Sequence, residues 1–470
     1  MQIVPSTFIA LIAIAALAAL GPRRGLWAFL ALTPLGAAAA FNLPSVGGAS
    51  IGLVQFAVVA LCLLVCLTPG GPNRVVGTLR PGQPGFWVAA LLVYCTFSAL
   101  YAPSVFRGAT EVFSISRDAN ARGIISLPLR PSNGNITQLF SMTLSVLAFL
   151  AFATIYRRRA DTSSVLTAMA IATGLHFALG WTDVLSHAVG LQNLLDPIRT
   201  ANYAILDDHR MIGMKRMIGG FPEASSFGAY SLGLFAFWLH LWLSRPNLRL
   251  ARIMLLASLV VLLRSTSSGA YAALIVFVLV YGGWAGIRHL RTTVSRSAVT
   301  VAMLVCLTIC IVALAILAAY HLFDPFTAFL DRSILNKLET RSGVERMSWN
   351  AQAFRNFLDT GMMGAGLGSV RASNWLLACL GSIGLIGTAL FLTFLYRVFR
   401  MPADPADQDT AVIIAALKTA CLALFLSDLL TAATPNLGVF FFALAGVATG
   451  LARGQRLRLA QPHAQLPYAT

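Results

Sequence analysis

The sequence predicts an all-α protein that crosses a membrane many times. Hydrophobic residues make up 57% of the 470 residues and charged residues only 11%, and the mean hydropathy is +0.76. A soluble globular protein needs more polar surface than this. The apolar residues also gather into runs of about 20, the length at which a helix crosses the hydrocarbon core of a bilayer. We therefore expect a single integral membrane domain over residues 1–470.

About twelve or thirteen apolar runs approach the length of a span. The second and the eighth are short, so the number is open by one or two. The runs lie near 3–20, 26–41, 51–67, 86–102, 138–156, 164–187, 224–243, 250–263, 269–287, 298–320, 374–396, 411–430 and 436–452.

The connections between these runs differ in charge and length. Short basic connections fall on one common side, which the positive-inside rule assigns to the cytoplasm. An odd number of spans then places the amino terminus outside and the carboxyl terminus inside. Three long polar segments lie on the outer side, at 103–137, 188–223 and 321–373.

The basic residues are more numerous outside than anchoring requires. The net charge is +17, and of 34 Lys and Arg residues 18 fall on the inner side and 15 on the outer side. In a soluble protein this charge would indicate nucleic acid, but here the partner is the membrane and we expect no nucleic acid. Either the outer loops bind an anionic ligand, or they form a solvated basic surface against anionic lipid headgroups.

The loop before the seventh run carries the densest group of ionisable residues. Arg210, Lys215 and Arg216 precede Glu223 within a short stretch. Glu223 is our leading candidate for a general base. The alternative is that Pro222 and Glu223 open a helix, with proline at its first position and the acid complementing the helix dipole.

Other ionisable residues remain open as site candidates. Asp208 and His209 are alternatives to Glu223, or loop residues in salt bridges. Asp183, His187 and Asp428 lie at the outer ends of apolar runs, where an ionisable group is a default site candidate.

The last long loop has a helix followed by glycines. Ser342 to Glu345 is a capping-box pattern that predicts an amphipathic helix on the outer surface, closed by Gly361. Arg341 and Arg346 stand at its start, where the helix dipole disfavours cations and their presence needs another reason. The glycines of 361–368 would either bring backbone amides to a ligand or allow close helix packing.

Several arginines on one outer face are suited to a diphosphate, because guanidinium groups bind phosphate oxygens through paired hydrogen bonds. A polyprenyl-linked donor is the plausible diphosphate there, and no cofactor is expected. A metal is not required if arginines stabilise the leaving group. The candidate cations are Arg210, Lys215, Arg216, Arg264, Arg341 and Arg346.

Two stretches resemble the motifs of bacterial O-antigen ligases and polysaccharide polymerases. The similarity covers about residues 200–400. It is carried by Arg216-x-x-Gly219-x-Phe221-x-Glu223-x-Ser225, by Arg346-x-x-Trp349-x-x-Gln352-Ala353-Phe354, by Gly364-x-Gly366-x-Gly368, by Asn374 and by Gly384-Leu-Ile-Gly387.

This resemblance implies a C-type membrane glycosyltransferase fold in the bacterial inner membrane. The implied substrate is an undecaprenyl-diphosphate-linked glycan on the periplasmic face, and the implied acceptor is a glycan or a lipid. A chain-length regulator or an envelope assembly complex is a further implied partner. Arg216 and Arg346 match the diphosphate-binding arginines of the family, and Asn374 belongs to its last motif.

The chain departs from the family at two positions. Ser267-Ser268-Gly269 stands where many members have Ser-Arg, which leaves Arg264 as a substitute. Ser373 stands where ligases place a catalytic histidine, and serine is no base. The sequence therefore favours a polymerase over a ligase. A lipid-linked oligosaccharide flippase and a structural subunit of an envelope complex stay as alternatives of other classes, although no internal repeat typical of transporters is found.

Overall fold

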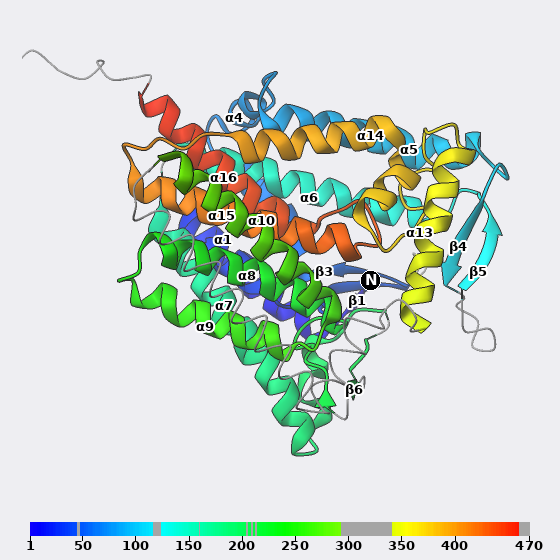
Figure 1. Ribbon diagram of the computed structural model, residues 1–470, viewed down its shortest axis with the longest axis horizontal. Helices are drawn as coiled ribbons and strands as arrows, with labels where there is room; N and C mark the ends of the chain where they lie inside the picture. Colours follow the sequence, from blue (N-terminus) through cyan, green and yellow to red (C-terminus); the bar gives the residue numbers. More distant parts are fainter. Residues whose placement is uncertain are drawn as a thin grey trace, which may run out of the picture.

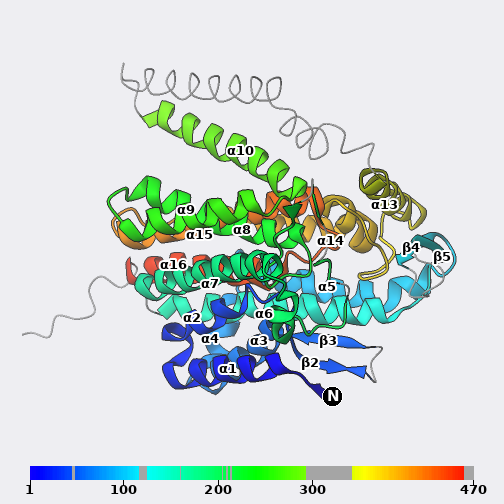
Figure 2. The ribbon, with the colours of Figure 1, turned by 90° about the horizontal axis from the view of Figure 1, so that it is seen from below.

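The protein is a bundle of long helices that run roughly along one axis (Figures 1 and 2). The computed structural model describes residues 1–44, 48–115, 124–158, 160–203, 205–207, 210–211, 214–292 and 341–459. Figure 2 shows α1–α3 along one edge, α6, α7 and α16 in the middle, and α8, α9 and α15 towards the other edge. The helix α10 lies outermost.

The helices begin and end as follows: α1 Pro5–Arg24, α2 Leu26–Leu32, α3 Leu53–Leu67, α4 Gly71–Thr78, α5 Pro84–Val105, α6 Asn133–Arg158, α7 Thr162–Ala188, the 3₁₀ helix η2 Gln192–Ile198, α8 Ala224–Ser244, α9 Arg249–Arg264, α10 Ser268–Thr292, α13 Arg341–Asp359, α14 Trp375–Arg400, α15 Gln408–Thr431 and α16 Gly438–Leu459.

Seven of the described helices are long and apolar enough to cross a bilayer, namely α1, α5, α6, α7, α8, α14 and α15. The bent pair α3 and α4, which meet at 111°, makes up to eight if it counts as one span. These helices indicate a polytopic membrane protein. The number in the described residues is lower than the twelve or thirteen expected.

Part of that difference is a wrong prediction at 26–41. The helix α2 ends at Leu32, and the chain unwinds so that the Ala37 amide donates to the Gly220 carbonyl (2.7 Å). Gly36 lies so close to the Phe221 ring that a Cβ atom there would be 2.8 Å from it. The run at 250–263 is helix α9 of 16 residues, and the run at 298–320 lies outside the described residues.

Three small antiparallel sheets were not predicted. The first has the order β1-β2-β3, and the other two are the hairpins β4-β5 and β6-β7. The strands are β1 Gln2–Ile3, β2 Ala39–Leu43, β3 Ala49–Gly52, β4 Glu111–Ile115, β5 Ile124–Pro128, β6 Arg210–Met211 and β7 Met214–Lys215.

The helices α6 and α16 pack backbone to backbone. Gly446, Gly450 and Gly454 recur every fourth residue on α16, and Cβ atoms there would lie 2.6–2.9 Å from carbonyl oxygens of α6. Small residues at this spacing let two membrane helices approach closely. The register of α16 against α6 is therefore fixed by these glycines.

The polar segments gather at one end of the bundle. The amino terminus, β4-β5 and α13 lie towards the same end, and the end of α16 lies at the opposite end (Figures 1 and 2). The predicted amphipathic helix is present as α13, and Gly361 follows it with a positive φ of 59°. The Gln352 side chain donates to the Glu111 carbonyl (2.7 Å), which fastens α13 to the β4-β5 hairpin.

Candidate functional site

The loop before α8 is anchored by Asp183, near the carboxyl end of α7. One carboxylate oxygen of Asp183 accepts from Arg199 Nη2 and from Lys215 Nζ, each at 2.5 Å. The other accepts from the amides of Ile218 (2.9 Å) and Gly219 (3.2 Å). Asp183 is 1% exposed and fully supplied with donors. It is therefore committed to holding the loop in place.

Two of the predicted ligand-binding cations, Lys215 and Arg210, have partners within the protein. Lys215 is 9% exposed and its ammonium group is taken up by Asp183, so a ligand would have to displace a buried ion pair to bind it. Arg210 is exposed on β6, and its Nη2 lies 3.4 Å from His187 Nε2. Sequence reasoning missed Arg199 because its partner lies 16 residues away in another element.

Glu223 is the N-cap residue of α8. The helix begins at Ala224, so the expectation of proline at the first helical position is wrong and Pro222 precedes the cap. The Glu223 carboxylate does not cap the helix amides. It accepts instead from the hydroxyl groups of Ser225 and of Ser226 (3.5 Å). Its second oxygen has no described partner and is available to a ligand.

The turn between α9 and α10 brings Arg264 to the same region. Its Nη1 donates to the Lys215 carbonyl (3.0 Å), directly before Arg216. Thr266 in this turn has a φ of 52°, a left-handed conformation that costs a non-glycine residue about 1–3 kcal/mol. The turn leads into α10, where the hydroxyl of Tyr271 lies within the electrostatic reach of Arg216 and Arg264.

Arg371, in the segment before α14, also lies in this region, and sequence reasoning missed it. Its guanidinium carbon lies over the Trp349 ring, 6.0 Å from the centroid. Trp349 is one helical turn beyond Arg346 on α13, so Arg371 lies over the face of α13 that also carries Arg346. The amide of Ser373 donates to Asn350 Oδ1 (2.7 Å), which ties the segment to α13. The sequence did hold a signal for Arg371, because the residue stands just before the start of α14, where the helix dipole disfavours a cation.

Electrostatic interactions join these residues into one site. Burial lowers the pKa of Arg216. The negative charges of Glu223 and Tyr271 act against this shift, and the positive charge of Arg346 adds to it. Burial also lowers the pKa of Arg371, and Glu223 opposes this shift too. We call Arg216, Arg264, Arg346 and Arg371 the arginine cluster.

The arginine cluster is not neutralised by the acids around it. Among the described residues, Glu223 lies beyond 4 Å of every guanidinium group, since the ion pairs found there are Arg199–Asp183, Lys215–Asp183 and Arg245–Asp409. The Nε atom of Arg216 is buried without a hydrogen-bond partner. An unpaired buried donor is costly, and an anionic ligand with several acceptor oxygens would satisfy it together with the other guanidinium groups.

The glycines after α13 allow close packing, which was the second of the two roles expected from the sequence. The amides of Ala365 and Gly366 donate to the carbonyls of Gly381 (2.8 Å) and Ser382 (3.0 Å) on α14. A Cβ atom on Gly368 would lie 2.3 Å from the Gly134 carbonyl. Because these amides are used inside the fold, this run is not a phosphate cradle.

The remaining predicted site residues have other surroundings. Asn374 caps α14 by accepting from the Leu377 amide (3.1 Å). Asp428 is partly buried on α15, and the described residues show no hydrogen bond or ion pair to its carboxylate. Asp208, His209 and the side chain of Arg341 lie outside the described residues.

The described ranges hold no group of three His, Cys, Asp or Glu side chains arranged as metal ligands. The chemistry visible in the site is that of several guanidinium groups beside one accessible carboxylate. Guanidinium groups can bind the oxygens of a polyanion, and a carboxylate beside them can accept a proton. Comparison of the sequence with models of known families and with curated proteins finds no match.

Proposed function

We propose that this protein is a membrane glycosyltransferase that transfers a glycan from a polyprenyl-diphosphate-linked donor. The observation that carries the proposal is the arginine cluster, with Glu223 beside it, at one end of a bundle of apolar helices. A lipid-linked diphosphate is an anion that reaches this position from within the bilayer. Several permanently charged donors would bind its phosphate oxygens at once.

The same groups supply the chemistry of transfer. The bond between the anomeric carbon and the diphosphate oxygen breaks, and the arginines stabilise the negative charge that develops on the leaving diphosphate. The acceptor hydroxyl forms the new glycosidic bond, and Glu223 accepts its proton. The products are the extended glycan and the polyprenyl diphosphate. The hydroxyl groups of Ser225 and Ser226 hold one oxygen of the Glu223 carboxylate, which supports this residue as the proton acceptor.

The proposed location is the bacterial inner membrane, with the arginine cluster on the periplasmic face. This orientation is supported by the basic connections after α1 and after α8, which lie at the end opposite α13 (Figure 2) and belong in the cytoplasm by the positive-inside rule. The amino terminus is then periplasmic and the carboxyl terminus cytoplasmic.

The proposed reaction is polymerisation of exopolysaccharide or O-antigen repeat units. Ser373 stands where the ligase pattern has histidine, and this supports a polymerase over transfer to a lipid A core. Under this proposal undecaprenyl diphosphate is the carrier lipid and the acceptor is a second lipid-linked glycan.

The deciding experiment is reconstitution of the purified protein in vesicles with lipid-linked repeat units as the sole substrate. A ladder of longer lipid-linked products is expected. Product that forms only after a lipopolysaccharide core is added would mean a ligase. Translocation of the substrate without any new covalent bond would mean a flippase. Arg216→Lys serves as the inactive control and Arg355→Lys, at an exposed position on α13, as the active one.

A further inference from the structure

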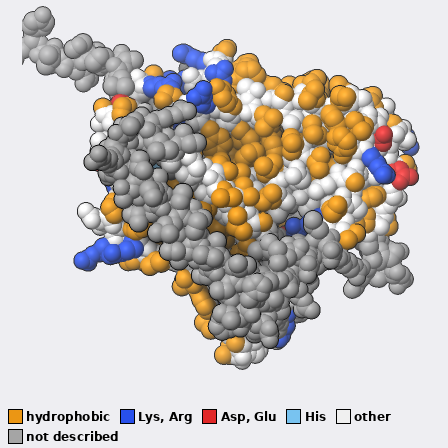
Figure 3. All heavy atoms as spheres, viewed as in Figure 1, with side chains coloured by type: hydrophobic (Ala, Val, Ile, Leu, Met, Phe, Trp, Pro, Cys, Tyr) orange, Lys and Arg blue, Asp and Glu red, His pale blue; other side chains and the backbone are white. Residues whose placement is uncertain are grey.

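A second group of arginines lies at the end of the bundle opposite the arginine cluster. Arg80 follows α4, Arg157 ends the apolar part of α6, and Arg453 lies in the last turns of α16. The charges of Arg80 and Arg157 both act on Arg453. We call these three residues the opposite-end triad. Figure 3 shows Lys and Arg side chains gathered over the end where α4 lies.

Close packing forces the triad together. Gly454, next to Arg453, lies so near α6 that a Cβ atom there would be 2.7 Å from the Arg157 carbonyl. Gly77 of α4 faces the Arg157 side chain, where a Cβ atom would be 2.7 Å from Nη1. Because these glycines have no side chain, the guanidinium groups come close together although they repel one another.

No acid in the described residues compensates this repulsion. Arg453 is 9% exposed, whereas Arg157 is half-buried and Arg80 is exposed. Within the described ranges none of the three side chains forms an ion pair or a hydrogen bond. A buried charge is costly unless it is paired. Arginines that merely anchor a span remain exposed, as Arg249 and Arg252 are at the same end of the bundle. The burial of Arg453 is therefore not explained by anchoring.

We propose that the opposite-end triad binds the phosphate group of an anionic phospholipid. The three guanidinium groups offer donors from three elements to one phosphate, and they lie where the helices of the bundle end and headgroups begin. This inference is independent of the proposed glycosyltransferase function, because it concerns the other end of the molecule.

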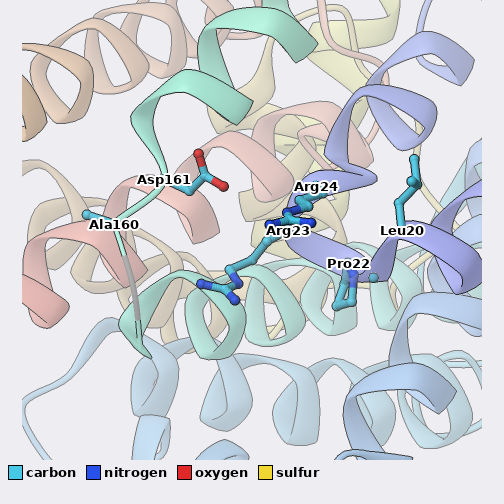
Figure 4. Close-up of a pocket in the computed structure, with 7 residues that line it drawn as sticks. Leu20, Pro22, Arg23, Arg24, Ala160 and Asp161 are labelled. Carbon is cyan, nitrogen blue, oxygen red and sulfur yellow. The ribbon is translucent and has the colours of Figure 1, made fainter.

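A cavity lies between the end of α1 and the start of α7. It has a volume of about 420 Å³ and is lined by Arg23, Arg24 and Asp161 (Figure 4). The Tyr156 hydroxyl donates to the Arg23 carbonyl (3.4 Å), so the cavity adjoins the end of α6 that carries Arg157. Asp161 Oδ1 caps α7 by accepting from the Ser164 amide (3.0 Å) and also accepts from the Ser163 hydroxyl (3.0 Å). The second carboxylate oxygen would be the acceptor for a hydroxyl of a glycerol headgroup.

The test uses the full-length protein, stripped of lipid in a neutral detergent. Phosphatidylglycerol, phosphatidylcholine and inorganic phosphate are added separately, and both the melting temperature and the bound lipid, by native mass spectrometry, are measured. The variant Arg80→Gln/Arg157→Gln/Arg453→Gln is compared with Arg249→Gln/Arg252→Gln/Arg397→Gln. The second variant removes the same charge from exposed positions of the same end.

We expect phosphatidylglycerol to bind the wild type and the control variant equally, and the triad variant at least 10-fold more weakly. Equal binding by the triad variant would overturn the proposal. Equal protection by inorganic phosphate would overturn the lipid as occupant and leave a soluble phosphate in its place.

The single variant Arg453→Gln keeps the test decisive if the triple variant does not fold. In lipid-free detergent it should melt at a higher temperature than the wild type, because the repulsion is relieved. Phosphatidylglycerol should raise its melting temperature less than that of the wild type. A lower melting temperature in lipid-free detergent would mean that Arg453 is paired within the protein, contrary to the proposal.

Discussion

Lys215 and Arg216 are neighbours in the sequence, and the structure gives them opposite surroundings. Lys215 points to Asp183, which also binds Arg199, and the charges are paired and buried. Arg216 lies within the electrostatic reach of Arg346, Glu223 and Tyr271, and its buried Nε has no hydrogen-bond partner among the described residues. The first region holds the loop in place, and the second leaves positive charge uncompensated.

The difference between Lys215 and Arg216 shows how to choose the cation that is the better candidate for ligand binding. A cation whose partner is already present stabilises the fold, and removing that partner is costly because the remaining charge stays buried. A cation that the fold leaves without an acid has its best partner outside the protein. Substitutions in the two regions should therefore affect different measurements.

The largest effect is expected for Asp183→Asn. This change leaves Arg199 and Lys215 buried without a counter-charge, which should lower the free energy of unfolding by about 3–5 kcal/mol. Thermal unfolding in detergent measures the loss. The matched control is Asp409→Asn, which breaks the exposed pair with Arg245 and should cost about 0–1 kcal/mol. Similar melting temperatures for the two variants would mean that Asp183 is not the anchor of the loop.

The next effect concerns activity and not stability. Arg216→Lys keeps the charge but removes the paired donors, and it should lower polymer formation by about 100- to 1,000-fold. Arg346→Lys should behave in the same way. Melting temperatures should stay near that of the wild type, as should the activity of the exposed control Arg355→Lys. Normal polymer from either cluster variant would remove that residue from the site.

Glu223→Gln separates proton transfer from binding. The amide keeps the size of the side chain and its contacts with Ser225 and Ser226, but it cannot accept a proton from the acceptor sugar. Turnover should fall by about 100-fold, whereas binding of the lipid-linked donor should change little. Unchanged turnover would leave Glu223 as the residue that starts α8, with no part in the reaction.

The smallest effect is expected for Trp349→Leu. The ring lies under Arg371, and a cation–π contact contributes about 0.5–2 kcal/mol. Its loss should weaken donor binding by about 2- to 30-fold and spare the turnover of bound donor. Trp349→Phe keeps an aromatic face and should recover most of the affinity. If both variants lose equally, the contact between Trp349 and Arg371 does not position the arginine.

Much of the helical fold could be predicted from the sequence, because long apolar runs report directly on spans. The errors fall where tertiary contacts override local preference. At 26–41 the backbone unwinds to bond with the loop before α8, and Gly36 makes room for Phe221. The short strands are equally hidden, since strands of two to five residues have too few positions to show alternation.

The site was partly predictable for a similar reason. Arg216, Glu223, Arg264 and Arg346 stand near helix entrances and attract attention in the sequence, and the structure brings them together. The function of Lys215 was not predictable, because it depends on Asp183, which lies 32 residues away in the preceding helix. The site prediction thus failed where a charged side chain pairs with a residue that is far away in the sequence and close in the fold.

The connection between the glycine run and α14 has a consequence for experiments at different ionic strength. It consists of neutral main-chain bonds, in which Ala365, Gly366 and Leu385 donate to the carbonyls of Gly381, Ser382 and Met362. Dissolved salt screens solvated charges beyond about 8–10 Å and leaves such bonds unchanged, and buried pairs such as that of Asp183 are screened far less. Added salt should therefore loosen an anionic ligand while the frame that carries Arg346 and Arg371 keeps its shape.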